Sequence, residues 1–300
     1  MMLRMGIAFW TIVITAFTLP VSAQDTTASR QEAVQPTALP RQVDVPEWYE
    51  MFTNIPGDWV NVATIATQPK NLIAIGEVGF LTVGLMACDD QTWRLTRDRA
   101  SSSAFVESGA EVIHSLGDGK YHLGLAAGLA AYGFVAEDRR AIRTASQTVE
   151  AVLSAGIVVQ VLKRITGRES PAMASSKSGR WRFLPNQAEY NRTQPKFYAF
   201  PSGHITTTVA TLTVLMENYP EAGWLKPVSY SLVGLVGISL VASDLHWYSD
   251  LPLGIMLGYT FGRVAARHSS GKVEEGGSLD VFFSPFILHD GAGLYFSVPF

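Results

Sequence analysis

Six apolar segments rich in small residues constrain the fold of this chain more than any other feature of its sequence. Their periodicity predicts helices, roughly at 71–88, 121–136, 141–165, 203–218, 225–242 and 250–267. Stretches such as "LGLAAGLAAYG" and "LVGLVGISLVAS" contain glycine, alanine and serine, which let helix backbones approach closely. We therefore expect an all-α fold in which six helices form one bundle.

The lengths of these segments bear on whether the helices cross a membrane. A helix needs ~20 mostly apolar residues to span a bilayer. Only 71–88 and 225–242 approach that length, and Glu77 interrupts the first. The others suit a buried core or short, protected spans. The sequence therefore favours a membrane-embedded or membrane-associated bundle only slightly over a soluble one.

The N-terminus has the three parts of a secretory signal peptide. Arg4 supplies positive charge, "GIAFWTIVITAFTL" is the apolar stretch, and "VSA" is a small-residue cleavage site that ends at Ala23. Residues 24–46 carry Gln, Thr, Pro and Ala without apolar periodicity, which is typical of a linker. We expect an exported protein in which the helical domain, residues 47–270, faces the periplasm or the exterior.

The tail, residues 271–300, differs from the helical region. Its sequence "LDVFFSPFILHDGAGLYFSVPF" predicts two strands around a turn at Asp290 and Gly291, that is, a small C-terminal β-hairpin.

Composition excludes several other classes of protein. The chain is 47% hydrophobic and 16% charged, so it is not intrinsically disordered. The net charge of −3 shows no basic bias, and we expect no nucleic-acid partner. The single cysteine, Cys88, can form neither an intrachain disulfide nor a thiolate metal site on its own.

The sequence "PSGH", residues 201–204, stands directly before the fourth apolar segment. Ser202 is a good N-cap, and the helix start offers unpaired N–H groups that bind anions. Gly203 lets a ligand approach the backbone. His204 falls in the first turn, where it could act as a general acid beside a bound phosphate. By itself, this motif is more often a turn with a helix cap than a site.

A second group is "SDLHWYSDLPLG", residues 243–254, in which His246 and Asp250 are four apart and Ser249 is a natural N-cap. A carboxylate bonded to one ring nitrogen fixes the tautomer and leaves the other nitrogen as a nucleophile or base. The alternative is a capping aspartate beside an interfacial His-Trp pair.

A third group is "VLKRITGRESP", residues 161–171, where Lys163, Arg164 and Arg168 close a long apolar segment. Cations are favoured at a helix C-terminus whatever the function, so these three residues alone indicate only a charged helix end.

Taken in this order between apolar helices, the three groups resemble the motifs of the type 2 phosphatidic acid phosphatase and vanadium haloperoxidase superfamily. Those motifs are K-x-x-x-x-x-x-R-P, P-S-G-H and S-R-x-x-x-x-x-H-x-x-x-D, and the resemblance covers roughly residues 70–268. "LGDGKYHLGLAAGLAAYG" is also similar to exported bacterial members. The resemblance implies a helical phosphatase that needs no metal or other cofactor and acts on a lipid-linked or small phosphate ester.

The resemblance also implies the roles of individual residues. The phosphate oxygens would be held by Lys163, Ser202 and Gly203. His204 would protonate the leaving alkoxide. His246, oriented by Asp250, would attack phosphorus and form a phosphohistidine that water then hydrolyses.

The chain departs from the family pattern at two arginines. Ser170 stands where arginine is expected before Pro171, and Leu240 stands where it is expected after Ser239. Removing one such preorganised donor typically costs ~100–1000-fold in rate. Other cations that could reach the phosphate instead are Arg168, Arg182 and Lys196.

Two other functions remain open at this point. A non-catalytic phosphate or lipid-phosphate binding protein with a degenerate site is favoured by the loss of both arginines. A vanadate-dependent haloperoxidase is least favoured, because trianionic vanadate needs those arginines more. A basic side chain in the space left by Ser170 and Leu240 would favour the enzyme, and an apolar one would favour the binding protein.

Overall fold

The computed structural model describes residues 45–268, 282–288 and 291–297. The expected signal peptide and nearly all of the expected linker lie outside these residues. The all-α fold class is confirmed. The expected number of six helices is wrong, because the described residues form eleven α-helices.

All six apolar segments are helical, with bounds close to those expected. They are α3 (Pro69–Met86), α6 (Gly119–Val135), α7 (Arg139–Thr166), α9 (Gly203–Asn218), α10 (Leu225–Ala242) and α11 (Leu251–His268).

The additional helices are α1 (Glu50–Thr53), α2 (Ile55–Thr67), α4 (Asp89–Ser101), α5 (Ala104–Ser115) and α8 (Gln187–Arg192). Two of them, α1 and α8, are short, with four and six residues. Helix α4, "DDQTWRLTRDRAS", is too polar to stand out as an apolar segment, so the apolar pattern alone does not reveal it. Three 3₁₀ turns complete the helical part: η1 (Pro171–Met173), η2 (Gln194–Lys196) and η3 (Tyr248–Asp250).

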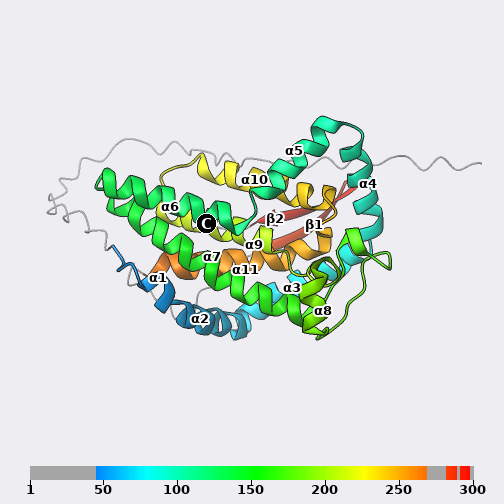
Figure 1. Ribbon diagram of the computed structural model, residues 1–300, viewed down its shortest axis with the longest axis horizontal. Helices are drawn as coiled ribbons and strands as arrows, with labels where there is room; N and C mark the ends of the chain where they lie inside the picture. The colour runs from blue at the N-terminus through cyan, green and yellow to red at the C-terminus, as the bar shows by residue number, and fades with distance from the viewer. Residues whose placement is uncertain (1–44, 269–281, 289–290, 298–300) are drawn as a thin grey trace, which may run out of the picture.

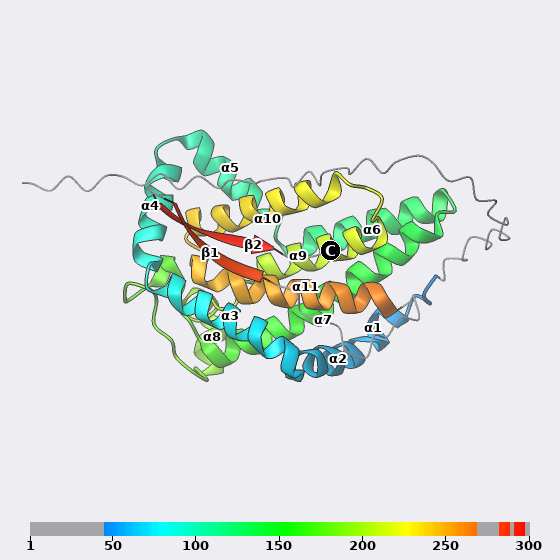
Figure 2. The same cartoon turned by 180° about the vertical axis from the view of Figure 1, so that it is seen from behind.

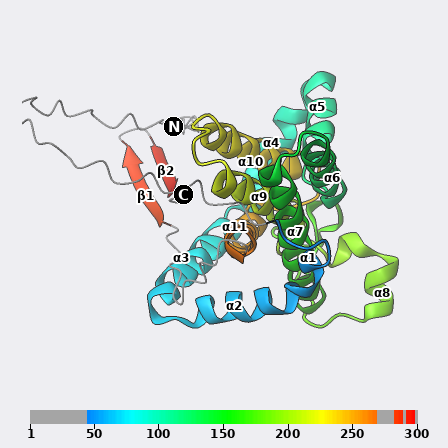
Figure 3. The ribbon, with the colours of Figure 1, turned by 90° about the vertical axis from the view of Figure 1, so that its left-hand side faces the viewer.

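Helices α7, α9 and α11 pack against one another at the centre of the bundle, as the end-on view in Figure 3 shows. Helix α6 lies along α7, α5 lies against α10, and α2 and α3 contact α11 on the opposite side (Figure 1). The ends of the three central helices therefore meet in one region.

Helices α9 and α11 approach each other closely because α11 presents glycine to α9. A Cβ atom on Gly258 would lie 2.5 Å from the Thr206 carbonyl oxygen, and one on Gly254 would lie 2.8 Å from that of Ser202. Any larger residue would push the two helices apart. This contact sets the start of α9, with its Pro-Ser-Gly-His sequence, against the start of α11.

The main apolar core lies between α9, α10 and α11. Its buried members are Ile205, Val209, Val236, Leu240 and Tyr259.

Two antiparallel strands follow the helices, β1 (Phe282–Leu288) and β2 (Gly291–Ser297) (Figure 2). Phe282 pairs with Ser297 and Leu288 with Gly291. Asp290, expected in the turn, lies outside the described residues.

Within the described residues, α7 and α10 are each long and apolar enough to cross a membrane. Helices α3 and α4 would together make a third span, bent by 67° at the break between them. Several large apolar side chains on other helices face outward: Phe80 is 84% exposed, Phe105 87% and Val135 88%. The chain thus presents an apolar exterior, which marks a surface that contacts a membrane or a partner.

Candidate active site

The first contributor to the candidate site is the C-terminal end of α7. Gly167, with φ of +54°, caps the helix, and its N–H donates to the Lys163 carbonyl oxygen at 3.0 Å. The left-handed conformation suits glycine, and a Cβ there would also collide with the Arg182 carbonyl oxygen. Lys163 is buried one turn before this cap, and its Nζ donates to the Tyr198 carbonyl oxygen.

The second contributor is the start of α9. Ser202 is the N-cap, as expected, and its Oγ accepts from the Ile205 N–H at 3.5 Å. A Cβ on Gly203 would lie 3.7 Å from the Lys163 Cε, so the lysine side chain runs beside the glycine backbone. The structure therefore brings the three expected phosphate ligands, Lys163, Ser202 and Gly203, together.

The third contributor is His246, which is fully buried. Its Nδ1 lies 2.7 Å from the Ala199 carbonyl oxygen and 3.5 Å from Asp250 Oδ2. A proton on Nδ1 is therefore held mainly by the Ala199 carbonyl, a contact that the sequence did not reveal. The Nε2 atom has no hydrogen-bond partner among the described residues, so its lone pair is available.

Asp250 is held by hydrogen bonds on both carboxylate oxygens. Its Oδ2 accepts from the Trp247 backbone N–H at 2.7 Å, and its Oδ1 accepts from the Arg168 guanidinium. Ser249, expected to cap the following helix, lies instead within η3, and its hydroxyl donates to Asp89 at 2.7 Å.

Arg168 is buried and uses all five N–H donors of its guanidinium. Nε and Nη2 each donate to the Ser178 carbonyl oxygen, at 3.2 and 2.8 Å. Nη2 also donates its second hydrogen to Asp89, at 2.7 Å. The two Nη1 donors serve Ser249, at 2.8 Å, and Asp250. Arg168 is thus positioned against Asp250, and its expected contact with phosphate stays a prediction.

His204 faces His246 across the site, with their ring centroids 5.9 Å apart. Its Nε2 lies 2.8 Å from Asp118 Oδ1. Asp118 occupies the N-cap position of α6. None of the three motifs contains this residue, although the "LGDGKYH" stretch around it is similar to exported family members. That similarity was the one feature of the sequence that could have indicated Asp118 as a site residue.

The electrostatics of the site favour neutral histidines. Burial, followed by the positive charges that His246 and Lys163 would carry, lowers the pKa of His204 to about 3, and Asp118 opposes this shift. Burial also lowers the pKa of His246, against the opposing effect of Asp250. A bound phosphate dianion would supply the negative charge that stabilises a protonated His204.

The two positions that lack the expected arginines have different surroundings. Leu240 packs in the apolar core between Val236 and Tyr259. Ser170 is buried, and its Oγ has no hydrogen-bond partner among the described residues. At Leu240, therefore, the side chain is enclosed by apolar neighbours.

The side chains of Arg182 and Lys196 form ion pairs with glutamates. Arg182 pairs with Glu169 at 3.4 Å and with Glu189 at 3.9 Å. Lys196 pairs with Glu189 at 4.0 Å. The structure does not bring these two residues together with His204 and His246, and their role as phosphate ligands stays a prediction.

A cavity of about 410 Å³ opens beside His114. Residues from α4, α5 and the end of α10 line it, including Arg97, Glu107, Ala110 and His114. The His114 ring lies edge-on to the His204 ring, with centroids 6.4 Å apart. His114 thus belongs to the lining of the cavity and is also a neighbour of His204.

Comparison with known proteins supports the relationship that the motifs indicate. A segment of 67 residues is 30% identical to lipid A 1-phosphatase of Porphyromonas gingivalis. The segment makes up 22% of this chain and 15% of that protein. The match thus spans well under two thirds of the relative's length.

Two solved structures are similar, each with a TM-score of 0.44. LpxE of Aquifex aeolicus is 17% identical, and the alignment covers 59% of this chain and 94% of LpxE. The first transmembrane PAP2-type phosphatidylglycerolphosphate phosphatase from Bacillus subtilis is 15% identical, and the alignment covers 76% of this chain and 98% of that one.

The PAP2 superfamily, which is that of the type 2 phosphatidic acid phosphatases, has a sequence model that matches residues 145–273. This range includes Lys163, the Pro-Ser-Gly-His sequence, His246 and Asp250. The family model therefore bears out the resemblance over the residues that carry the three motifs.

Proposed function

We propose that this chain is a phosphatase that removes phosphate from a lipid-linked or small phosphate ester through a phosphohistidine on His246. One observation carries the proposal: the buried His246 Nε2 has no hydrogen-bond partner among the described residues, while Nδ1 is held by the Ala199 carbonyl and Asp250. An imidazole fixed in this tautomer is a nucleophile aimed at a phosphate held by the α9 N-terminus.

The reaction has two steps. In the first, the Nε2 lone pair of His246 forms a bond to phosphorus as the bond to the leaving oxygen breaks, and protonated His204 gives that oxygen its proton. In the second, His204, now neutral, takes a proton from water, whose oxygen attacks phosphorus and releases phosphate and free His246. Lys163 and the N–H groups at the start of α9 stabilise the phosphate charge in both steps.

These groups supply the positive charge for the reaction, and we propose that it needs no metal ion. We further propose that the protein is exported and works at the periplasmic side of a membrane. The signal-like N-terminus and the spans offered by α7 and α10 support this placement.

The substrate class follows from the same reasoning. The relatives named above include phosphatases of lipid A and of phosphatidylglycerol phosphate. The apolar exterior of this chain would hold it in contact with lipids. A phosphorylated lipid is therefore the substrate that we favour over a soluble ester.

The second candidate function is a non-catalytic phosphate or lipid-phosphate binding protein. Two observations favour this function. Leu240 has apolar neighbours, so no cation takes the place of the missing arginine there. Arg168 already uses all its donors within the protein. The site nevertheless keeps both histidines, the aspartate and the lysine, which binding alone does not require.

Phosphate release by the purified protein tests the proposal. The panel would contain phosphatidic acid, phosphatidylglycerol phosphate, undecaprenyl pyrophosphate, lipid A and a soluble aryl phosphate, with the His246→Ala variant as a blank. We expect release above the blank for at least one lipid. Saturable binding of a phosphorylated lipid without release from any substrate would instead establish the binding protein.

The replacement Asp118→Asn is expected to shift the pH profile of kcat/KM toward acid. Asp118 raises the pKa of His204, so its loss lowers that pKa further. A general acid must be protonated, so activity falls as the pH rises through its pKa, and this fall moves to lower pH by about one unit. Kinetics of wild type and variant over a range of pH would measure it. A parallel loss at every pH would show that Asp118 is only structural.

The replacement Ala110→Phe fills part of the cavity that His114 lines. If the leaving group of a lipid substrate occupies this cavity, KM for the lipid should rise about 10-fold or more, and KM for a small aryl phosphate should change little. The control is Ala104→Phe, at an exposed position of the same helix. Equal changes in KM for both substrates would place the leaving group elsewhere.

A further inference from the structure

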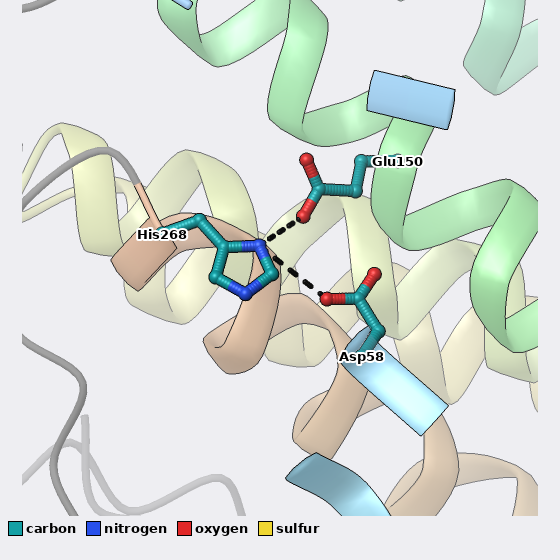
Figure 4. A group of neighbouring side chains, drawn as sticks. All are labelled: Asp58, Glu150 and His268. Carbon is teal, nitrogen blue, oxygen red and sulfur yellow. Dashed lines mark hydrogen bonds and ion pairs between the residues drawn. The ribbon is translucent and has the colours of Figure 1, made fainter. Parts of the chain in front are cut away.

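Three polar side chains from three separate helices meet at a place remote from the candidate active site. They are Asp58 of α2, Glu150 of α7 and His268, the last residue of α11 (Figure 4). Glu150 precedes Lys163 by 13 residues on α7, since 163 − 150 = 13, which corresponds to about 20 Å along the helix. This cluster is therefore separate from the groups that face a phosphate.

Each residue of the cluster directs one donor atom toward the other two. His268 Nδ1 lies 2.6 Å from Glu150 Oε1 and 3.4 Å from Asp58 Oδ1. All three donor atoms lie within 4.8 Å of one another. The other oxygen of Glu150 accepts from the Asn54 side-chain amide at 3.0 Å, which fixes the orientation of this carboxylate.

Burial makes the cluster costly without a further positive charge. Asp58 is 1% exposed and Glu150 2% exposed. Neither oxygen of Asp58 has a hydrogen-bond partner among the described residues, and the carboxylate points at His268 (Figure 4). Even with His268 protonated, two carboxylates face one cation, and a buried carboxylate that is left uncompensated is strongly unfavourable.

The same imbalance is visible in the acid–base properties of the group. Burial, together with the charge of Glu150, raises the pKa of Asp58 to about 7, although His268 opposes the shift. The hydrogen bond to Glu150 raises the pKa of His268. Helix α7 is also one of the helices apolar enough to cross a membrane, where a retained carboxylate indicates a function.

One imidazole and two carboxylates form a donor set that suits a divalent transition-metal ion. Two donor atoms at about 2.1 Å from one tetrahedral ion lie about 3.4 Å apart. The distance between His268 and Asp58 already has this value, and the Glu150 contact would lengthen from a hydrogen bond to match it. We propose that Asp58, Glu150 and His268 bind one divalent ion of the Zn²⁺ type, with water completing its coordination.

The proposed ion would be structural. It would join α2, near the start of the described chain, to the middle of α7 and to the end of α11. Because its ligands come from three helices, the ion binds the folded chain far better than the unfolded one, and it stabilises the fold by mass action. Removal of the ion would loosen α2 and leave the groups at the phosphate site in place.

Zn²⁺ titration of the full-length protein, purified in detergent and treated with a chelator, tests this proposal. Calorimetry should show one ion bound per chain, and Zn²⁺ should raise the Tm. In the Asp58→Asn and Glu150→Gln variants, binding should weaken by about 100-fold or more, because even residues that only support a metal ligand cost 10–100-fold. The control Asp90→Asn, which removes a carboxylate paired with Arg94 on α4, should bind Zn²⁺ as wild type does.

Several results would overturn the proposal. One is the absence of saturable binding of Zn²⁺ or Mn²⁺ to wild type, and another is equal binding by wild type and Asp58→Asn. A third is an Asp58→Asn variant that is more stable than wild type and indifferent to Zn²⁺, because the cluster would then be only an ion pair between His268 and Glu150.

X-ray absorption of wild type with one equivalent of Zn²⁺ provides a test that needs no variant. It should show one imidazole and further oxygen ligands at about 2.0–2.2 Å. A spectrum without an imidazole, or with more than one, would place the ion elsewhere.

Discussion

Replacement of His246 by alanine should lower kcat for phosphate release by about 10⁴-fold or more, the loss expected when a covalent nucleophile is removed. The side chain is fully buried and its Nε2 has no hydrogen-bond partner among the described residues, so the variant loses the nucleophile of the proposed reaction. Binding of a phosphate ester should persist, because Lys163 and the start of α9 remain.

A phosphoenzyme measurement makes this test specific. Wild type mixed with a radiolabelled substrate and quenched rapidly should carry an acid-labile phosphoryl group, and the His246→Ala variant should carry none. The matched control is His122→Ala, which also removes a buried imidazole but one that contacts Thr208 of α9. Retention of more than about a tenth of the activity by His246→Ala would eliminate the phosphohistidine.

Replacement of Arg168 by methionine should destabilise the fold by about 3–5 kcal/mol. The guanidinium joins Asp89 of α4 to Asp250 beside the nucleophile, and all three side chains are fully buried. Methionine fills much of the same volume, but it leaves two buried carboxylates without their cation. The free energy of unfolding in detergent, from denaturant titration, would measure the effect.

Two companion variants separate the loss of the buried charge from other effects. Arg182→Met removes a partly exposed pair with Glu189 and a 3.4 Å contact with buried Glu169. The Glu169 carboxylate keeps its hydrogen bonds from the Ser175 and Arg180 N–H groups, so this change should cost about 1 kcal/mol or less. Adding Asp89→Asn to Arg168→Met removes one of the two unpaired carboxylates and should restore part of the stability. Equal losses for Arg168→Met and Arg182→Met would show that the buried network contributes little.

Local sequence patterns were sufficient to predict a large part of this protein. The six apolar segments are helices, and Ser202 caps α9 as its position before Gly203 and His204 indicates. The order of the three motifs indicated the superfamily whose sequence model matches residues 145–273. Helix caps and apolar periodicity act over a few residues, so they can be read without knowledge of the tertiary structure.

Helix number and the partners of the charged residues were harder to predict. Helices α4 and α5 lack a long apolar run, so the search for apolar segments gave six helices where the described residues have eleven. The hydrogen bond between Arg168 and Asp89 could not be expected, because Asp89 begins α4, a helix that no apolar segment had indicated.

The contacts that only the tertiary structure decided join residues far apart in the chain. Asp118 meets His204, the Ala199 carbonyl meets His246, and Asp58 meets His268. Each depends on how one helix or loop packs on another, as where glycines of α11 let α9 approach. The sequence alone determined the helices, their caps and the chemistry carried by the motifs, because these depend on neighbours along the chain. Packing decided which charges face one another, because no local pattern encodes distances between helices.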